Sequence, residues 1–266
     1  MPQQDTFIIT LTPKQLPSFR GWRATPALMA YRLGPGPHLF RADHASLPRG
    51  ALMVVDGREF NGLGPVGPLC QEIFRECQAR GFSGVILDFD TQLPPLQQIA
   101  AQLDASFAKR GLSLYVPEHY GLCAPHAQVM IPSPLSGGSL SLRLEDAVQR
   151  FGQGRVALAL EKVAEDFPLP SPTGEGQPLS PQQLEELMSR LSPCVFFSGD
   201  LCARYFTYMG QNGGAHFVLF DDEDTLCRKV EVAHQAGIHT FLAPWVQVSA
   251  QAAQMGIPKK SPPGRM

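Results

Sequence analysis

The chain has 266 residues, of which 44% are hydrophobic and 17% are charged, and its formal net charge is −2. This balance gives no electrostatic reason to expect nucleic acid as a partner, and no apolar run is long enough to span a bilayer. The length suits a single α/β barrel, and the composition supports a large core.

Apolar, strand-like runs alternate with helix-like stretches along the chain, as expected of βα units. Several runs are continuously apolar, which is typical of strands in a parallel sheet with both faces buried. Strands are predicted at 7–11, 27–33, 51–57, 84–90, 112–118, 127–133, 155–161, 216–222 and 239–245, with a further short candidate at 194–197.

Amphipathic helices are predicted between these strands. The stretches 67–81 and 94–111 each place their large apolar residues on one stripe at helical spacing. A third helix begins with Ser180 as N-cap and Pro181 at the first helical position. A fourth ends at Gly237, which suits the position after a helix.

About eight such units in this length favour a (β/α)8 TIM barrel, with a doubly wound open sheet as the alternative. Segments rich in proline and glycine, such as 167–181, are interpreted as barrel loops because the strand–helix alternation resumes on either side. We therefore predict a single barrel domain over residues 1–255. The last segment, 256–266, is predicted to be a flexible, Pro-rich basic tail.

Acidic residues stand at the ends of four predicted strands, namely Asp56, Asp90, Glu118 and Glu161. Barrel enzymes build their sites at the carboxyl ends of the strands. Acids also follow strands simply because a strand must exit to water, but four together with neighbouring aromatic residues favour a ligand site. Carbohydrate suits this combination, since its hydroxyls need acceptors and its C–H faces stack on rings. The aromatic neighbours are Phe89, Tyr115, Tyr120 and Trp245.

Side chains alternate along a strand, so Ile86, Asp88 and Asp90 share one face, which in a barrel is the interior. One carboxylate buried beside another has a raised pKa, which is what a general acid needs near neutral pH. A structural network bonded to neighbouring hydroxyls is the alternative interpretation of this pair.

The stretch "GFSGVILDFD" resembles the signature of glycoside hydrolase family 18, the chitinases and spore-cortex hydrolases, whose fourth strand carries D-G-x-D-x-D-x-E. Aligned on Gly84, the third Asp of the signature falls on Asp88 and its catalytic Glu on Asp90, whereas Ser83 and Ile86 replace the first two acids. The motif is therefore degenerate.

The stretch 205–245 resembles the end of the same family, so that the resemblance covers roughly residues 51–250. Trp245 lies one residue beyond the position of the family's site-floor Trp. The other positions that fit are Asp221, Asp222, Thr225, Lys229, Val230 and Gly237.

The resemblance implies a substrate-assisted retaining mechanism, in which the Glu protonates the glycosidic oxygen and the sugar's own N-acetyl oxygen attacks the anomeric carbon. By transfer, Asp90 is the acid and Asp88 stabilises the acetamido group. Asp90 is one methylene shorter than Glu, and an offset on the order of 1 Å can cost ~100-fold in rate. Pro132 replaces the Tyr of the family's sixth-strand motif. Glu118 or Glu161 is an alternative acid.

The leading hypothesis is a family 18-like protein that acts on or binds an N-acetylglucosamine-containing glycan, either peptidoglycan or chitin-like, with a spore-related role as one option. Its catalytic residues are Asp90 and Asp88. The alternatives are a catalytically inactive barrel that binds glycan or serves as a spore-coat scaffold, and a barrel acting on an unrelated small molecule. The expected glycan-binding residues are Glu118, Glu161, Tyr115, Tyr120, Trp245 and Asp56.

No other class of site is predicted. The seven histidines show no metal-ligand spacing, and the glycine-containing loop 133–139 lacks the Lys of a phosphate-binding loop, so we expect neither metal nor cofactor. The six cysteines form no CxxC pair, which is typical of free, mostly buried thiols. The N-terminus has no secretory signal pattern, so a cytoplasmic location is expected, with a glycan as partner and neither nucleic acid nor membrane.

Overall fold

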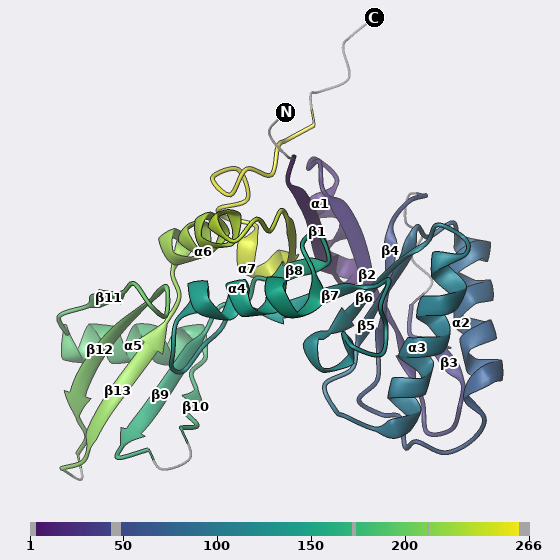
Figure 1. The fold of residues 1–266 in the computed structure, drawn as a ribbon. Coiled ribbons are helices and arrows are strands. Elements are labelled where there is room, and N and C mark those ends of the chain that lie inside the picture. Colours follow the sequence, from purple (N-terminus) through teal and green to yellow (C-terminus); the bar gives the residue numbers. More distant parts are fainter. Residues whose placement is uncertain (1–3, 44–48, 172–173, 212, 261–266) are drawn as a thin grey trace, which may run out of the picture.

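The computed structural model describes residues 4–43, 49–171, 174–211 and 213–260. Eight parallel strands close into a barrel, because the first strand pairs with both the second and the last (Figure 1). This closure confirms the predicted (β/α)8 TIM barrel and rules out the open sheet. The barrel strands are β1 (Thr6–Leu11), β2 (Thr25–Leu33), β4 (Leu52–Asp56), β5 (Gly84–Asp88), β6 (Ser113–Pro117), β7 (Gln128–Pro132), β8 (Val156–Ala159) and β14 (Thr240–Pro244).

The inside of the barrel is filled by apolar side chains that alternate with outward-facing ones along each strand. Ile86 of β5 is buried there against residues from the strands around it, including Val54 and Tyr115. The predicted inward direction of this face of β5 is thus confirmed. Gly84 begins β5, and any Cβ at this position would overlap the backbone of Ser113 on β6, so a glycine lets the two strands approach.

A second, larger apolar core lies between the barrel and its outer helices. The helix α4 was not predicted, because its apolar positions follow a Ser- and Gly-rich segment that obscures where it begins. No helix within the described residues is both long and apolar enough to cross a membrane. The outer elements are η1 (Pro13–Gln15), α1 (Leu16–Phe19), β3 (Leu39–Arg41), α2 (Val66–Arg80), α3 (Pro94–Ala108), η2 (Glu118–Tyr120), α4 (Leu140–Phe151), α6 (Glu223–Gln235) and α7 (Trp245–Val248).

A separate antiparallel sheet, here called the inserted sheet, interrupts the barrel between β8 and α6 and projects to one side of it (Figure 1). The stretch 216–222 is therefore a strand, as predicted, but one of the inserted sheet rather than of the barrel. The stretch 167–181, interpreted as a barrel loop, contributes two strands to it. Its elements are β9 (Ala164–Leu169), β10 (Gln177–Pro178), α5 (Pro181–Leu191), β11 (Phe196–Ser198), β12 (Ala203–Met209) and β13 (Ala215–Phe220).

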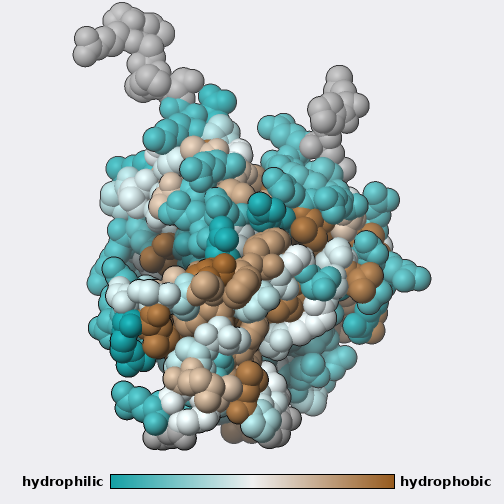
Figure 2. Space-filling model, turned by 90° about the vertical axis from the view of Figure 1, so that its left-hand side faces the viewer, coloured by the Kyte–Doolittle hydropathy of each residue, from teal (hydrophilic) through white to brown (hydrophobic). Residues whose placement is uncertain are grey.

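The two faces of the inserted sheet differ. One packs Phe206, Val218 and Phe220 against Leu187 of α5. The other carries four rings side by side, here called the aromatic row, and consecutive ring centroids lie 5.6, 5.3 and 6.0 Å apart. Figure 2 views the molecule from the side to which the inserted sheet projects in Figure 1, and apolar side chains interrupt the hydrophilic surface there. The rings of the row are Phe196, Tyr205, Phe217 and Phe167.

A buried ion pair joins the inserted sheet to the barrel. Asp221 directly follows β13 and accepts hydrogen bonds from Nζ of Lys229 on α6 at 2.6 Å, from Oγ1 of Thr225 at 2.7 Å and from the backbone N–H of Val163 at 2.8 Å. Both charged side chains are completely buried. Asp222 caps α6 through a reciprocal pair of hydrogen bonds with Thr225. Asp221, Asp222, Thr225 and Lys229, which fit the family resemblance, therefore stabilise the fold.

The predicted tail begins as ordered structure. Ile257 is fully buried, and the backbone of Lys260 donates a hydrogen bond to the carbonyl of Gly21. Lys259 forms a β-bridge with Trp22 and places its ammonium over that ring. Residues 256–260 are thus docked against the barrel, contrary to the expectation of a loose tail, and 261–266 lie outside the described residues.

Candidate functional site

A cavity of about 400 Å³ opens at the carboxyl ends of the barrel strands. The last residues of several strands line it, among them Asp88 of β5, Pro132 of β7 and Pro244 of β14. Its other acidic lining residues follow the strand ends, so the barrel brings together acids from three separate βα connections. These acids are Asp90, Glu118 and Glu161.

Asp88 is the most perturbed carboxyl group of the cavity. Its pKa is raised from 3.8 to about 6, first by desolvation and then by the negative charges of Asp90 and Asp56, with a smaller contribution from Glu161. Arg58 opposes this rise. Asp88 therefore exchanges its proton in the range where a general acid or a proton-sharing partner works.

The pKa of Asp56, at the end of the neighbouring strand β4, is shifted in the opposite direction to that of Asp88. Desolvation disfavours its charge, but hydrogen bonds from the side chain and backbone of Arg58 outweigh that effect and lower its pKa. The guanidinium of Arg58 donates to both carboxylate oxygens, at 2.6 to 3.0 Å. Asp56 is not among the residues that line the cavity, and it contributes a fixed negative charge beside Asp88.

Glu161 is positioned by a buried serine. The Oγ of Ser133 accepts a hydrogen bond from the backbone N–H of Glu161 at 3.1 Å and lies 3.2 Å from its carbonyl oxygen, to which it donates. Ser133 is fully buried, so the backbone that follows β8 is fixed at the cavity wall. Desolvation and the charge of Asp90 raise the pKa of Glu161. Besides Asp88, Glu161 is therefore a cavity acid whose surroundings favour the protonated form that a proton donor needs.

Glu118 is already paired. Its carboxylate accepts a hydrogen bond from Nη2 of Arg143 at 2.8 Å, and Nη1 of Arg150 lies 3.9 Å away. Both arginines come from α4. The Glu118 carboxylate is therefore held by cationic partners. Asp90, by contrast, is exposed at the rim of the cavity.

Three aromatic residues expected at the site lie elsewhere. Tyr115 is buried in the barrel interior beneath the cavity. Tyr120 packs in the outer core and donates a hydrogen bond to the carbonyl of Thr91 at 2.5 Å. The Nε1–H of Trp245 donates to Oγ of Ser18, and the ring packs on the outside of the barrel. The cavity lining contains none of these three, so a Trp floor is not formed by Trp245.

Three polar residues at or beside the cavity were not predicted from the sequence. Arg58 follows a strand-ending acid by two residues, and that spacing is a usable signal for a local ion pair. Arg143 was not predicted because it lies on helix α4, which was itself not predicted. His119 lines the cavity directly after Glu118, but one exposed histidine has no distinctive pattern in the sequence.

Solved structures with the same fold come from chitinases and spore cortex-lytic enzymes. The spore cortex-lytic enzyme SleL of Bacillus megaterium matches with a TM-score of 0.63 and 14% identity, over 91% of this chain and 71% of that one. A class V chitinase from Nicotiana tobaccum, in complex with NAG4, matches with a TM-score of 0.68 and 11% identity, over 95% and 99%.

A chitinase from Chromobacterium violaceum matches with a TM-score of 0.62 and 15% identity, over 91% of this chain and 95% of that one. No family model matches the sequence, and no curated protein does. At such low identities the likeness shows the fold alone, which is the barrel fold of these chitinases and spore cortex-lytic enzymes.

Proposed function

We propose that the chain is a glycosidase of the family 18 type that cleaves N-acetylglucosamine-containing glycan in the barrel cavity. The observation that carries this proposal is the group of acids at the cavity, where Asp88 has a pKa of about 6 beside Asp90 and Glu161. The fold supports it, because the class V chitinase of the same architecture is seen in complex with NAG4.

In the proposed reaction, Asp90 donates a proton to the glycosidic oxygen as the bond between this oxygen and the anomeric carbon breaks. The acetamido oxygen of the sugar forms a bond to the anomeric carbon, and Asp88 accepts a hydrogen bond from the acetamido N–H. Water then attacks the anomeric carbon, breaks its bond to the acetamido oxygen and returns a proton to Asp90. The raised pKa of Asp88 suits a site in which one proton is shared between the two carboxyl groups.

Turnover of fluorogenic N-acetylglucosamine oligomers tests this proposal. We expect Asp90→Asn and Asp88→Asn each to reduce kcat by about 100-fold or more. Glu161→Gln separates the two candidate acids: a loss larger than that of Asp90→Asn would move the acid role to Glu161. Glu186→Gln on the exposed side of α5 is the matched control and should leave turnover unchanged.

A non-catalytic glycan-binding barrel is the second candidate, and one observation favours it. Pro132 lines the cavity at the position where the family carries a Tyr, so this wall has no hydroxyl with which to hold the acetamido group. Calorimetric titration with N-acetylglucosamine oligomers separates the candidates, because binding without turnover supports the second. Absence of both binding and turnover would contradict both.

A further inference from the structure

Three potential metal ligands meet at the end of the barrel opposite the cavity. Asp5 immediately precedes β1, His239 immediately precedes β14, and His234 lies on the last turn of α6. The cavity lies at the other ends of the same two strands, where Thr10 and Pro244 line it. The cluster is therefore separate from the proposed glycan site.

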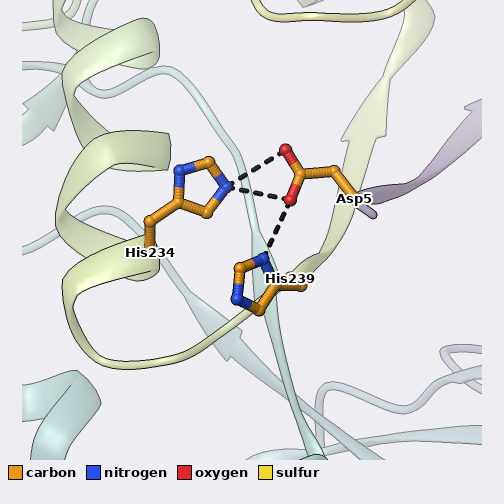
Figure 3. A group of neighbouring side chains, drawn as sticks. All are labelled: Asp5, His234 and His239. Atoms are coloured by element: carbon orange, nitrogen blue, oxygen red, sulfur yellow. Dashed lines mark hydrogen bonds and ion pairs between the residues drawn. The ribbon is translucent and has the colours of Figure 1, made fainter. Parts of the chain in front are cut away.

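The three side chains point toward one another (Figure 3). The Nε2 of His234 lies 3.0 and 3.1 Å from the two carboxylate oxygens of Asp5, and the Nδ1 of His239 lies 3.0 Å from one of them. One ligand atom from each residue lies within 4.8 Å of the other two. In a tetrahedral zinc site with bonds of about 2.0–2.1 Å, ligand atoms lie roughly 3.3 Å apart, so small side-chain shifts accommodate an ion.

The environment also suits a metal. The side chains are 37%, 23% and 29% exposed for His234, His239 and Asp5, so an ion has a path to them. A hollow of about 400 Å³ borders Asp5, so water reaches this carboxylate. The two imidazole rings stack with their centroids 5.2 Å apart, and His234 also packs edge-on against Phe241, so both rings already lie side by side next to Asp5.

We propose that Asp5, His234 and His239 form a binding site for a divalent transition metal of the zinc type. Two imidazoles and one carboxylate match the ligands of zinc, with water completing the tetrahedron. The same ligands are poor for magnesium, which prefers oxygen atoms alone. This site was not predicted from the sequence, because no local spacing links residues that are 229 positions apart.

The position of the site gives the metal a structural role. Asp5 and His239 stand at the beginnings of β1 and β14, the neighbouring strands that close the barrel. An ion bound to them and to His234 links the first strand to the last βα unit. Because these three ligands meet only in the folded chain, an ion that binds them stabilises the folded state over the unfolded one, and thermal stability rises.

Titration of the untagged full chain with zinc chloride, by calorimetry and by thermal unfolding, tests the proposal. We expect one zinc ion per chain and an increase in Tm of several degrees, with no such increase in magnesium chloride. His234→Gln and His239→Gln should each weaken zinc binding by at least roughly tenfold. His126→Gln is the matched control, since His126 pairs with Asp104 elsewhere on the surface.

Undiminished zinc binding by His234→Gln would overturn the proposal, and so would the absence of zinc binding by the unaltered chain. The exposed ring of His234 makes this variant the one best able to fold. Should a variant fail to fold, the absorption spectrum of the Co²⁺-loaded unaltered chain decides. An intense visible band without the near-ultraviolet charge-transfer band of thiolate ligands supports the site, whereas the weak bands of octahedral Co²⁺ or a thiolate charge-transfer band would overturn it. Asp88→Asn should bind zinc normally, which keeps this test independent of the glycosidase proposal.

Discussion

The barrel and the inserted sheet differ in how the faces of their strands are covered. The barrel strands are apolar on the inside and covered by helices on the outside, and a group of acids lies at the mouth. The inserted sheet covers one face with α5 and leaves the aromatic row on the other. Walls of protein around a carboxyl group raise its pKa, whereas an open sheet cannot do so. The barrel is therefore the region suited to the proton transfer proposed above, whereas the inserted sheet carries a partly exposed row of rings.

The largest expected effect concerns the ion pair that joins the two regions. Lys229→Met leaves Asp221 buried without its charged partner, so we expect a loss of about 3–5 kcal/mol in the free energy of unfolding. Chemical denaturation of the full chain measures this loss. Lys109→Met, at an exposed position, is the control and should change stability little. A similar small change for Lys229→Met would show that the joint depends on apolar packing alone.

A pair of truncations compares the two apolar surfaces directly. Ile86 is 3% exposed in the barrel interior, so Ile86→Ala should cost about 2–5 kcal/mol, through lost burial and a cavity. Phe196 of the aromatic row is 54% exposed, and Phe196→Ala should cost less than about 1 kcal/mol. Urea denaturation measures both. Equal losses would mean that another surface covers the aromatic row, and the loss would then depend on protein concentration.

The acid cluster should make the barrel less stable as the pH rises. The pKa of Asp88 is about 6 when folded and near 3.8 when unfolded, so the folded state holds more protons between these values. Stability is therefore lost as the pH rises through this window. Asp88→Asn should weaken this dependence, leaving the part that comes from the raised pKa of Glu161, and raise stability at pH 7.5 by about 1–3 kcal/mol. Denaturation curves between pH 4 and pH 7.5 check it, with Glu186→Gln as the control that keeps the slope.

The smallest effect is a difference in thiol reactivity that leaves stability unchanged. Cys194 precedes the inserted strand β11 and is exposed, whereas Cys70 and Cys77 are buried on α2. Burial raises the pKa of Cys70 to about 12 and that of Cys77 to about 11, so both react slowly. Labelling of the native chain with a chromogenic disulfide should show a fast phase that Cys194→Ser removes. If the fast phase persists unchanged, it belongs to another thiol, for which the half-buried Cys123 and Cys227 are the first candidates.

The sequence predicts the barrel well because its strands are short, apolar and regularly separated. The inward direction of Asp88 follows from the two-residue alternation of β5 alone. The inserted sheet could not be recognised in the same way, because β13 has the apolar composition of a barrel strand and only its partners reveal an antiparallel sheet.

Site residues could be predicted where strand geometry determines which way a side chain points. They could not be predicted where packing against other elements determines it. Asp90, Glu118 and Glu161 reach the cavity because each follows a barrel strand. Whether Tyr120 or Trp245 faces the cavity or the outer core depends on neighbouring elements such as α1 and η1, whose positions no local pattern encodes. Clusters across the barrel closure, such as that of Asp5 with two histidines, require knowledge of the closure itself.

The pairing of β1 with β14 has a consequence for how the chain is made. β1 leaves the ribosome well before one of its two neighbours, β14, which begins at Thr240. Until β14 emerges, β1 has one unpaired edge. Late closure of this kind favours slow folding and gives other nascent chains an edge to pair with. The docking of Ile257 and Lys260 against the barrel follows only after β14 has been translated.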